Sequence, residues 1–363
     1  MSIDFSPQRW EELRQTYRAW WAGRLTRPLM AATCVNRDPG RPKPRAPLLS
    51  QATCTELSIP ADALVDRIDW ELSRCSYFGD AYPLWNMDCF GPGVMAAFVG
   101  AKLDTSTGRV WFRPLRDVPI RELHLEYDPD NPWLRRVKEL CAAMTQRWQG
   151  QVLVTMTDLG GNLDVLSTFR PAEALLLDLY DHPAEVIRVR DEAHRLWHRF
   201  FAEIHAVLQP YNPGYSAWCG IYSERPYYML QCDFSYMIGP DMFRQFVRPE
   251  LDATTRLLEH SFYHLDGKGQ LPHLDAVLAL EHLEGVQWVP GDGAPPPSAW
   301  PEIYERIFKA GKKTQLWGRW PEVYALLERT GIGPGVHYPS WSSAAEEQET
   351  RCWVDRFASA RWA

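Results

Sequence analysis

A histidine and an aspartate two residues apart are the pair in this sequence best suited to chemistry. His264 and Asp266 lie in SFYHLDGKGQLPHLD, where a short apolar run ends before Gly267. Residues i and i+2 of an extended segment point to the same side, so both side chains should face one site. Imidazole and carboxylate both bind Zn²⁺, which could activate a water or a thiol. The pair could instead orient a substrate or move protons, or simply satisfy a carbonyl and cap the turn.

A cysteine and an aspartate precede the helical pattern of residues 237–261. In QCDFSYMIGPDMF, Asp233 could cap that helix or accept hydrogen bonds from a ligand, and Cys232 could be a thiolate ligand or a buried thiol. A lone histidine near the last expected strand could shuttle protons or be a satisfied core residue. The candidate catalytic residues are His264, Asp266, Asp233 and His337, and the candidate metal ligands are His264, Asp266 and Cys232.

Acidic and aromatic residues at expected strand ends supply candidate substrate contacts. Tryptophan and tyrosine can wall a pocket for a flat or cationic ligand, although they could equally plug one end of a barrel. An aspartate at such a position binds polar groups or caps a turn. The candidate substrate-binding residues are Asp88, Asp158, Trp218, Tyr228, Trp288 and Trp317.

These residues must be positioned by alternating strands and helices. Apolar runs that end in polar residues alternate with helical patterns, which indicates parallel βα units. The first helix is expected at 7–24, and strands at 27–35, 151–158, 215–220, 261–267, 285–291, 312–318 and 335–340. We expect a single domain, 1–363, of the α/β class: a (β/α)8 TIM barrel with an N-terminal helical extension. A doubly wound open sheet is the alternative, but no GxGxxG follows the first strand. In a barrel, functional residues gather where the strands end.

Composition narrows the partners. The 363 residues are 45% hydrophobic and 23% charged with net charge −7, and no Lys/Arg-rich block occurs, so we expect no nucleic acid partner. The first residues lack the apolar core of a signal peptide, and no run is long enough for a membrane span. Eight scattered cysteines without a CxxC motif suit reduced thiols in the cytoplasm.

Several segments together resemble the uroporphyrinogen decarboxylase superfamily. QCDFSYMIGPDMFRQFVRPEL, SFYHLDG and GVQWVPG are similar to its C-terminal half, and CFGPGVMAAFVGA and GNLDVLSTFRPAEALLLDLYDHPAEV to earlier parts. The resemblance covers most of residues 10–360 and implies a barrel with its pocket at the strand ends. Asp88 falls near the family's aspartate. The strand RPLMAATCV lacks the family's paired-arginine RQAGRY pattern, which argues against a standard uroporphyrinogen decarboxylase.

A second branch of the superfamily resembles this chain in another way. Its corrinoid-linked methyltransferases, like cobalamin-independent methionine synthase, use zinc to make a thiol nucleophilic, with ligands that begin His-x-Cys and end with a further Cys. Here Asp266 stands in place of the first Cys, and no Cys lies near the last strand. The sequence therefore lacks the cysteine ligands of that family's zinc site. The alternative is a metal site with oxygen and nitrogen ligands, in which His264 and Asp266 act with Cys232 or His337.

The resemblance implies an enzyme that moves a methyl group between a small methylated substrate and a thiol or corrinoid acceptor, assisted by zinc. The corrinoid would be carried by a partner protein, and the chain could form a homo-oligomer. One alternative is a cofactor-free decarboxylase or lyase of the same fold, in which Asp88 or Asp233 stabilises a protonated intermediate. Another is a non-catalytic barrel that binds a tetrapyrrole or corrinoid. Metal content would separate the first from the others.

Overall fold

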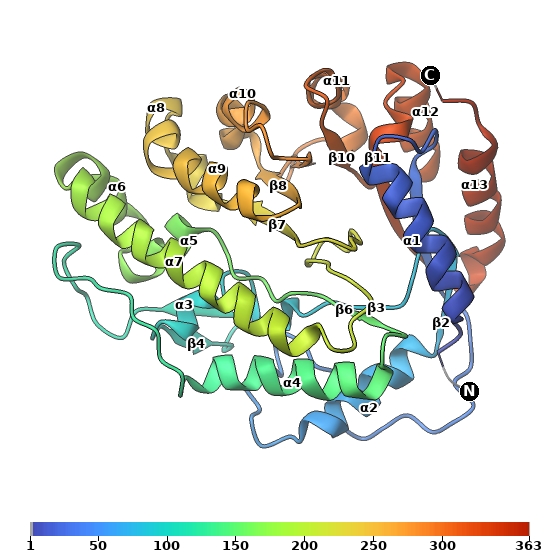
Figure 1. Cartoon of the computed structure of the whole chain (residues 1–363), viewed down its shortest axis with the longest axis horizontal. Coiled ribbons are helices and arrows are strands. Elements are labelled where there is room, and N and C mark those ends of the chain that lie inside the picture. Colours follow the sequence, from blue (N-terminus) through green and yellow to red (C-terminus); the bar gives the residue numbers. More distant parts are fainter. Residues whose placement is uncertain (1–2, 363) are drawn as a thin grey trace.

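A mostly parallel sheet is the centre of the computed structural model, which describes residues 3–362 (Figure 1). Its strand order is β2-β1-β11-β10-β9-β8-β7, and only β2 pairs antiparallel, with β1 at one edge. The strands are β1 (Leu29–Val35), β2 (Cys75–Gly79), β7 (Tyr227–Gln231), β8 (His260–Asp266), β9 (Gly285–Val289), β10 (Lys313–Gln315) and β11 (Val336–Ser343). Two separate pairs are parallel β3 (Leu84–Trp85) with β6 (Leu153–Val154), and antiparallel β4 (Lys102–Asp104) with β5 (Trp111–Arg113).

Helices follow the parallel strands in sequence, as parallel pairing requires, because each such pair needs a crossover connection. Figure 1 shows α9 to α13 along the seven-stranded sheet, and α2, α4 and α7 beyond β3 and β6. The helices are α1 (Pro7–Trp21), α2 (Ala61–Leu72), α3 (Met95–Phe98), α4 (Pro132–Trp148), α5 (Asn162–Phe169), α6 (Ala172–Asp181), α7 (Pro183–Leu208), α8 (Pro240–Met242), α9 (Arg248–Leu257), α10 (Leu274–Leu278), α11 (Pro301–Lys309), α12 (Trp320–Thr330) and α13 (Glu347–Ser359).

The α/β class is therefore confirmed, but the closed barrel is not. Backbone pairing between the described strands does not complete a ring, because β3 and β6 are hydrogen-bonded to neither edge of the seven-stranded sheet. The chain that follows β6 nevertheless lies close to β7. The backbone N–H of Leu159 donates to the Tyr228 hydroxyl at 2.8 Å, and a Cβ on Gly161 would meet the Gln231 carbonyl oxygen at 2.3 Å.

The predicted N-terminal helix is confirmed as α1. The Ser6 hydroxyl caps it by accepting from the Arg9 N–H, and Pro7 suits its first turn. Its buried face includes Trp20 and Trp21, whose rings pack against Phe262 and stack on His260 at the start of β8. The helix therefore covers the amino-terminal ends of the strands.

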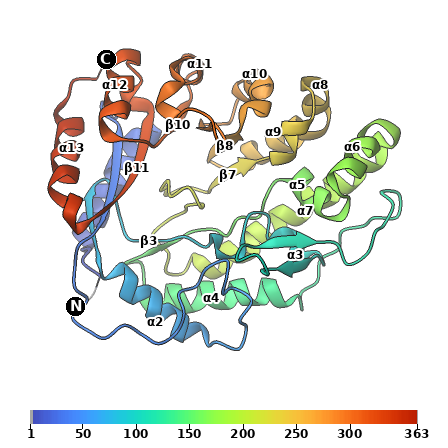
Figure 2. The same cartoon turned by 180° about the vertical axis from the view of Figure 1, so that it is seen from behind.

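The strand expected at 215–220 is wrong. Those residues form an irregular segment between α7 and β7, with one antiparallel bridge between Tyr215 and Ser223. Asn86 donates to the Trp218 carbonyl at 2.9 Å, and Gln315 of β10 donates to the Cys219 carbonyl at 2.8 Å. Figure 2 shows this segment running between the seven-stranded sheet and β3. It therefore lies between the seven-stranded sheet and the β3–β6 pair.

None of the helices in the described part of the chain combines the length and apolar character needed to cross a bilayer.

Candidate functional site

Two acidic residues and a histidine converge at the carboxyl ends of β7 and β8. Asp233, His264 and Asp266 each place one ligand atom within 4.8 Å of the others. The shared face predicted for His264 and Asp266 is confirmed, since Nε2 of His264 lies 3.9 Å from Oδ2 of Asp266. The side chain of His264 is 13% exposed and that of Asp266 40%, so the cluster (hereafter the acidic cluster) opens to solvent on the Asp266 side.

The chain turns sharply after Asp266 because Gly267 adopts a left-handed conformation, with φ of +80°. The Gly267 N–H donates to the Val289 carbonyl at 2.8 Å, which ties the turn to β9. A Cβ on Gly267 would come within 2.8 Å of the Tyr236 ring. The tyrosine thus covers the turn, and the last residues of β8 are held in place beside the segment that carries Asp233.

A buried carboxylate supports Asp233 from behind. Asp164 in the first turn of α5 accepts the backbone N–H groups of Asp233 at 3.1 Å and Phe234 at 2.7 Å. Burial and the nearby charge of Asp233 raise the pKa of Asp164. Burial, Asp266 and Asp158 raise the pKa of Asp233 as well. These carboxyl groups therefore retain protons at a higher pH than free aspartates do.

Burial acts in the opposite direction on the histidine. It lowers the pKa of His264, and the hydrogen bond to Gln287 and the charge of Asp266 oppose the shift. The lowered pKa favours a neutral imidazole at neutral pH, which is the form that binds metals.

A cavity of about 530 Å³ adjoins Trp218. The indole packs edge-on against His264, with ring centroids 4.9 Å apart, and it also lines the cavity. Asp88, at the start of a 3₁₀ turn (Asp88–Phe90), lines the same space, and burial raises the pKa of its carboxyl. The predicted substrate-binding residues Asp88 and Trp218 thus share one cavity, although Trp218 reaches it from a loop and not from a strand end.

Two predicted residues, Cys232 and His337, lie outside the acidic cluster. Cys232 is fully buried. The third residue whose ligand atom lies within 4.8 Å of those of His264 and Asp266 is Asp233, not Cys232. His337 was expected at the carboxyl end of its strand, but it is the second residue of β11 and pairs with Leu29, the first residue of β1. The strand continues to Ser343, beyond the expected 335–340, and His337 lines the same cavity as Asp88 and Trp218.

The remaining predicted contacts are scattered. Asp158 is buried, accepts the Gly160 N–H at 2.8 Å and the Gln231 side chain at 3.3 Å, and has a pKa raised to about 7 by burial. The buried Tyr228 hydroxyl accepts from Leu159. Trp288 is fully buried and packs against Trp300. Half-buried Trp317 lines a separate surface groove with Asp266 and Asp292.

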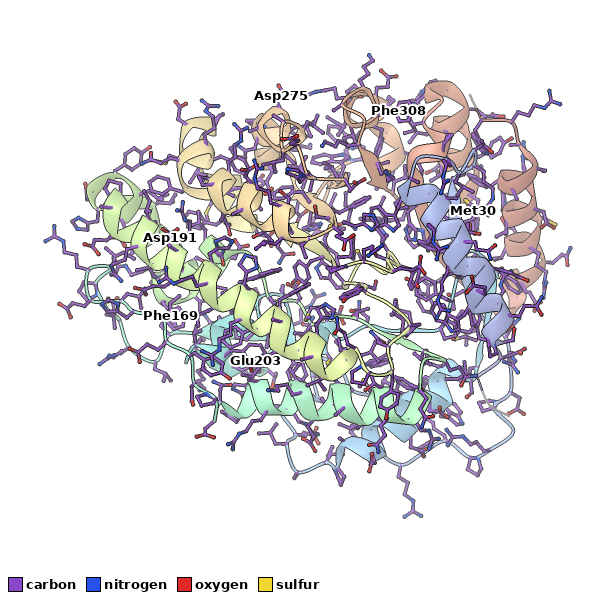
Figure 3. All side chains as sticks on the ribbon, viewed as in Figure 1. Met30, Phe169, Asp191, Glu203, Asp275 and Phe308 are labelled. Atoms are coloured by element: carbon purple, nitrogen blue, oxygen red, sulfur yellow. The ribbon has the colours of Figure 1, made fainter. Side chains whose placement is uncertain are left out.

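The residues after the acidic cluster in the sequence face away from it. His273 is buried, stacks on Phe243 and bonds the Ser235 carbonyl at 2.9 Å. Asp275 is exposed on α10 (Figure 3), and its carboxylate pairs with Arg306 at 2.6 Å. Neither residue belongs to the site.

Sequence reasoning missed the buried glutamines beside His264. Gln287 Oε1 lies 2.5 Å from Nδ1 of His264, and Gln315 contacts Gln287 in turn. Their signal was present: GVQWV and KTQLW each place a glutamine next to an apolar residue inside an expected strand.

No protein-family model matches the chain, and no curated protein matches it. Among solved structures, the fold is similar to that of a methyltransferase from Methanosarcina mazei, with a TM-score of 0.60 and 12% sequence identity. The alignment covers 96% of this chain and 99% of that one. At this identity the similarity concerns the fold.

Proposed function

We propose that this chain is a metal-dependent methyltransferase that moves a methyl group from a small methylated substrate to a thiol or to a corrinoid carried by a partner protein. The observation that carries the proposal is the acidic cluster, with three ligand atoms within 4.8 Å of one another where two parallel strands end. The similarity to a methyltransferase fold supports it. We also propose that the fold is of the barrel type and that the chain belongs to the uroporphyrinogen decarboxylase superfamily.

The residues fit a catalytic zinc. Catalytic sites take three protein ligands and leave a fourth position open, and His264 with Asp233 and Asp266 supplies one nitrogen and two oxygens. Burial favours neutral His264, and the partly exposed Asp266 leaves a route for entry. When bound, zinc would lower the pKa of a thiol acceptor, so that the acceptor reacts as a thiolate at neutral pH.

The chain's own residues would bind and orient the methyl donor. The cavity beside Trp218 offers aromatic walls from Trp85 and Trp218 and the carboxyl group of Asp88, a combination that suits a methylated, cationic centre. In the transfer, a bond forms between the acceptor sulfur and the methyl carbon, and the bond from methyl to its leaving group breaks. The leaving group keeps the electron pair, and the thiol proton passes to solvent.

Metal content tests the proposal first. Purified protein incubated with zinc and then dialysed should retain close to one equivalent, and His264→Ala should lose it. His282→Ala is the matched control, because His282 is exposed and distant from the acidic cluster in the sequence. Methyl transfer to a small thiol or to free corrinoid should depend on the same metal. Wild-type protein that retains no metal and transfers no methyl group would refute the proposal.

The buried carboxyl groups favour a second candidate, a cofactor-free decarboxylase or lyase. The raised pKa values of Asp158, Asp164 and Asp233 supply protonated acids close to His264, which proton transfer to a carbanion needs. Activity of this kind should survive a chelator, whereas metal-dependent methyl transfer should not.

A further inference from the structure

Five polar residues form one row across the sheet. Register pairs Gln231 with His264, His264 with Gln287, Gln287 with Gln315, and Gln315 with His337. Paired residues on neighbouring strands face the same side, so the row presents its side chains to one face. Gln231, Gln287, Gln315 and His337 are buried, and such groups require hydrogen-bond partners.

The row contains a continuous chain of hydrogen bonds. Nδ1 of His264 lies 2.5 Å from Oε1 of Gln287, and Nε2 of Gln287 donates to Oε1 of Gln315 at 2.5 Å. Nε2 of Gln315 lies 2.9 Å from Nδ1 of His337, whose Nε2 lies 3.2 Å from the Tyr17 hydroxyl on α1. We call Gln287, Gln315, His337 and Tyr17 the glutamine relay. It connects the acidic cluster to the helix beneath the strands.

A backbone carbonyl fixes the direction of the relay. On their own, two amides and two imidazoles could donate in either direction along the chain, because each amide can turn over. Nε2 of Gln315, however, also donates to the Cys219 carbonyl at 2.8 Å, and a carbonyl only accepts. Turning Gln315 over would bring two acceptors together. Its nitrogen therefore faces both Cys219 and His337, and its oxygen faces Gln287.

The remaining bonds follow from that orientation. The Gln315 oxygen needs a donor, so Gln287 presents its nitrogen there and its oxygen to His264. Nδ1 of His264 must then carry a proton, which leaves the lone pair of the neutral ring on Nε2. At the far end, the Tyr17 hydroxyl is left to donate to the Asp80 carbonyl, at 3.5 Å, so every donor points the same way.

We propose that the glutamine relay is a positioning device that holds neutral His264 in the Nδ1-protonated tautomer, so that the lone pair on Nε2 faces Asp233 and Asp266. The inference deepens the proposed metal site, and it rests on the proposed function only where metal affinity is concerned. Gln287 and Gln315 act through His264. Partners of this kind fix the ring orientation of a ligating histidine and typically change metal affinity about 10- to 100-fold when they are replaced.

Nitrogen NMR of protein labelled with [15N]histidine tests the tautomer without metal or substrate. The two ring nitrogens resonate far apart according to which one carries the proton, and the His264 signals are identified by their absence in His264→Gln. Wild type should show a proton on Nδ1. Gln287→Leu and Gln315→Leu should both populate the Nε2-protonated form, and Gln287→Glu should restore the Nδ1-protonated form because a carboxylate accepts from Nδ1–H.

Two further variants separate an effect of the relay on His264 from a general destabilisation of the protein. Gln270→Leu is the matched control, since Gln270 is also a fully buried glutamine but bonds Tyr263 outside the relay. It should leave His264 unchanged. Gln315→Glu cannot donate to His337 but still accepts from Gln287, so it should move the His337 proton to Nδ1 and leave His264 as in wild type.

Zinc affinity supplies the second readout, measured by competition with a chromophoric chelator. Gln315→Leu should bind zinc about 10- to 100-fold more weakly than Gln270→Leu. An Nε2-protonated His264 in wild type, or an unchanged tautomer in Gln287→Leu and Gln315→Leu, would overturn the relay. Wild type that binds no zinc yet shows the expected tautomers would instead remove the metal from the proposed function and leave the relay standing.

Discussion

The cysteine next to the acidic cluster contributes its backbone and not its thiol. The Cys232 carbonyl accepts from the N–H of Ser235 at 3.1 Å and from its hydroxyl at 2.7 Å, which begins the 3₁₀ turn that carries Asp233. Its side chain is fully buried, and burial raises the pKa of the thiol well above its ordinary value. A thiol of this kind is a poor metal ligand and a poor nucleophile.

Thiol reactivity should reflect this difference in exposure. Cys352 on α13 is exposed, Cys219 is half-buried with a thiol pKa raised to about 11 by burial, and Cys232 is buried. A disulfide reagent that reacts with thiols should therefore modify one thiol of the native protein, that of Cys352, rapidly. Cys352→Ser should abolish the rapid phase, and Cys232→Ala should change neither that phase nor the bound zinc. A rapid phase that disappears in Cys232→Ala would show that the thiol is accessible after all.

At this scale, the sequence predicted the three residues that the structure brings together in the acidic cluster. Asp233, His264 and Asp266 are polar residues that directly follow apolar runs, and such residues stand out. Gln287 and Gln315 did not, because an uncharged amide in a strand has no chemical signature until its register neighbours are known. Trp218 was placed at the mouth for the wrong reason, since its segment is not a strand.

At the level of elements, the closest approach near the site is between the start of α5 and the end of β7. Gly161, with φ of −81°, would bring a Cβ to 2.3 Å from the Gln231 carbonyl oxygen and 2.5 Å from Oδ2 of Asp164. The backbone angle itself suits any residue. The absence of a side chain is what lets α5 bring Asp164 beneath Asp233.

Gly161→Ala should therefore destabilise the protein by about 1–3 kcal/mol, the usual cost of overpacking. Gly239→Ala is a matched control, because Gly239 also caps a helix, has φ of −79° and would place its Cβ in open space. Urea denaturation should show a lower midpoint for Gly161→Ala than for Gly239→Ala. Equal midpoints would mean that α5 can move away from β7 without cost.

Element types were more predictable than element positions. Alternation of apolar strands and helices identified β8, β9 and β10, whose residues are buried as periodicity implies. β7 was missed because PYYMLQ follows soon after the apolar YSAWCG. Local pattern alone does not decide which of two neighbouring runs pairs with a strand far away in the sequence. The same non-local pairing decides whether a ring of strands closes.

Across the whole molecule, buried ionisable groups set the response to pH. Burial raises the pKa of Asp158 to about 7 and that of Glu250 to about 8. Free carboxyl groups titrate near 4, so above that pH the folded protein holds protons that the unfolded chain has lost. The contribution of these groups to stability is therefore complete below about pH 4, falls as the pH rises above that value, and levels off above their folded pKa values of about 7 and about 8.

Buried histidines affect the stability of the protein over a different pH range. Burial lowers the pKa of His205 and of His337 to about 3, so their contribution is present above the unfolded value near 6.5 and is lost as the pH falls below it. From about pH 7 to 8.5 the carboxyl groups therefore dominate the change, and the melting temperature of the wild type should fall.

Glu250→Gln should flatten that fall. The Asn162 amide donates to Glu250 and can donate equally to a glutamine oxygen, so the substitution removes the titration and keeps the bond. Thermal unfolding at about pH 7 and 8.5 measures both slopes. Exposed Glu302→Gln serves as the control and should keep the wild-type slope. Parallel slopes in all three proteins would show that Glu250 is ionised throughout.

The position of α1 also has a consequence for how the protein is made. The Tyr17 hydroxyl on α1 contacts His337, which comes 320 residues later in the sequence. At translation rates of 5–20 residues per second, about 16 to 64 s pass between the synthesis of the two. During that time Trp20 and its neighbours lack the last strand that they cover, so the nascent chain exposes an aromatic helix face. The helix can reach its final packing only after the last strand has left the ribosome.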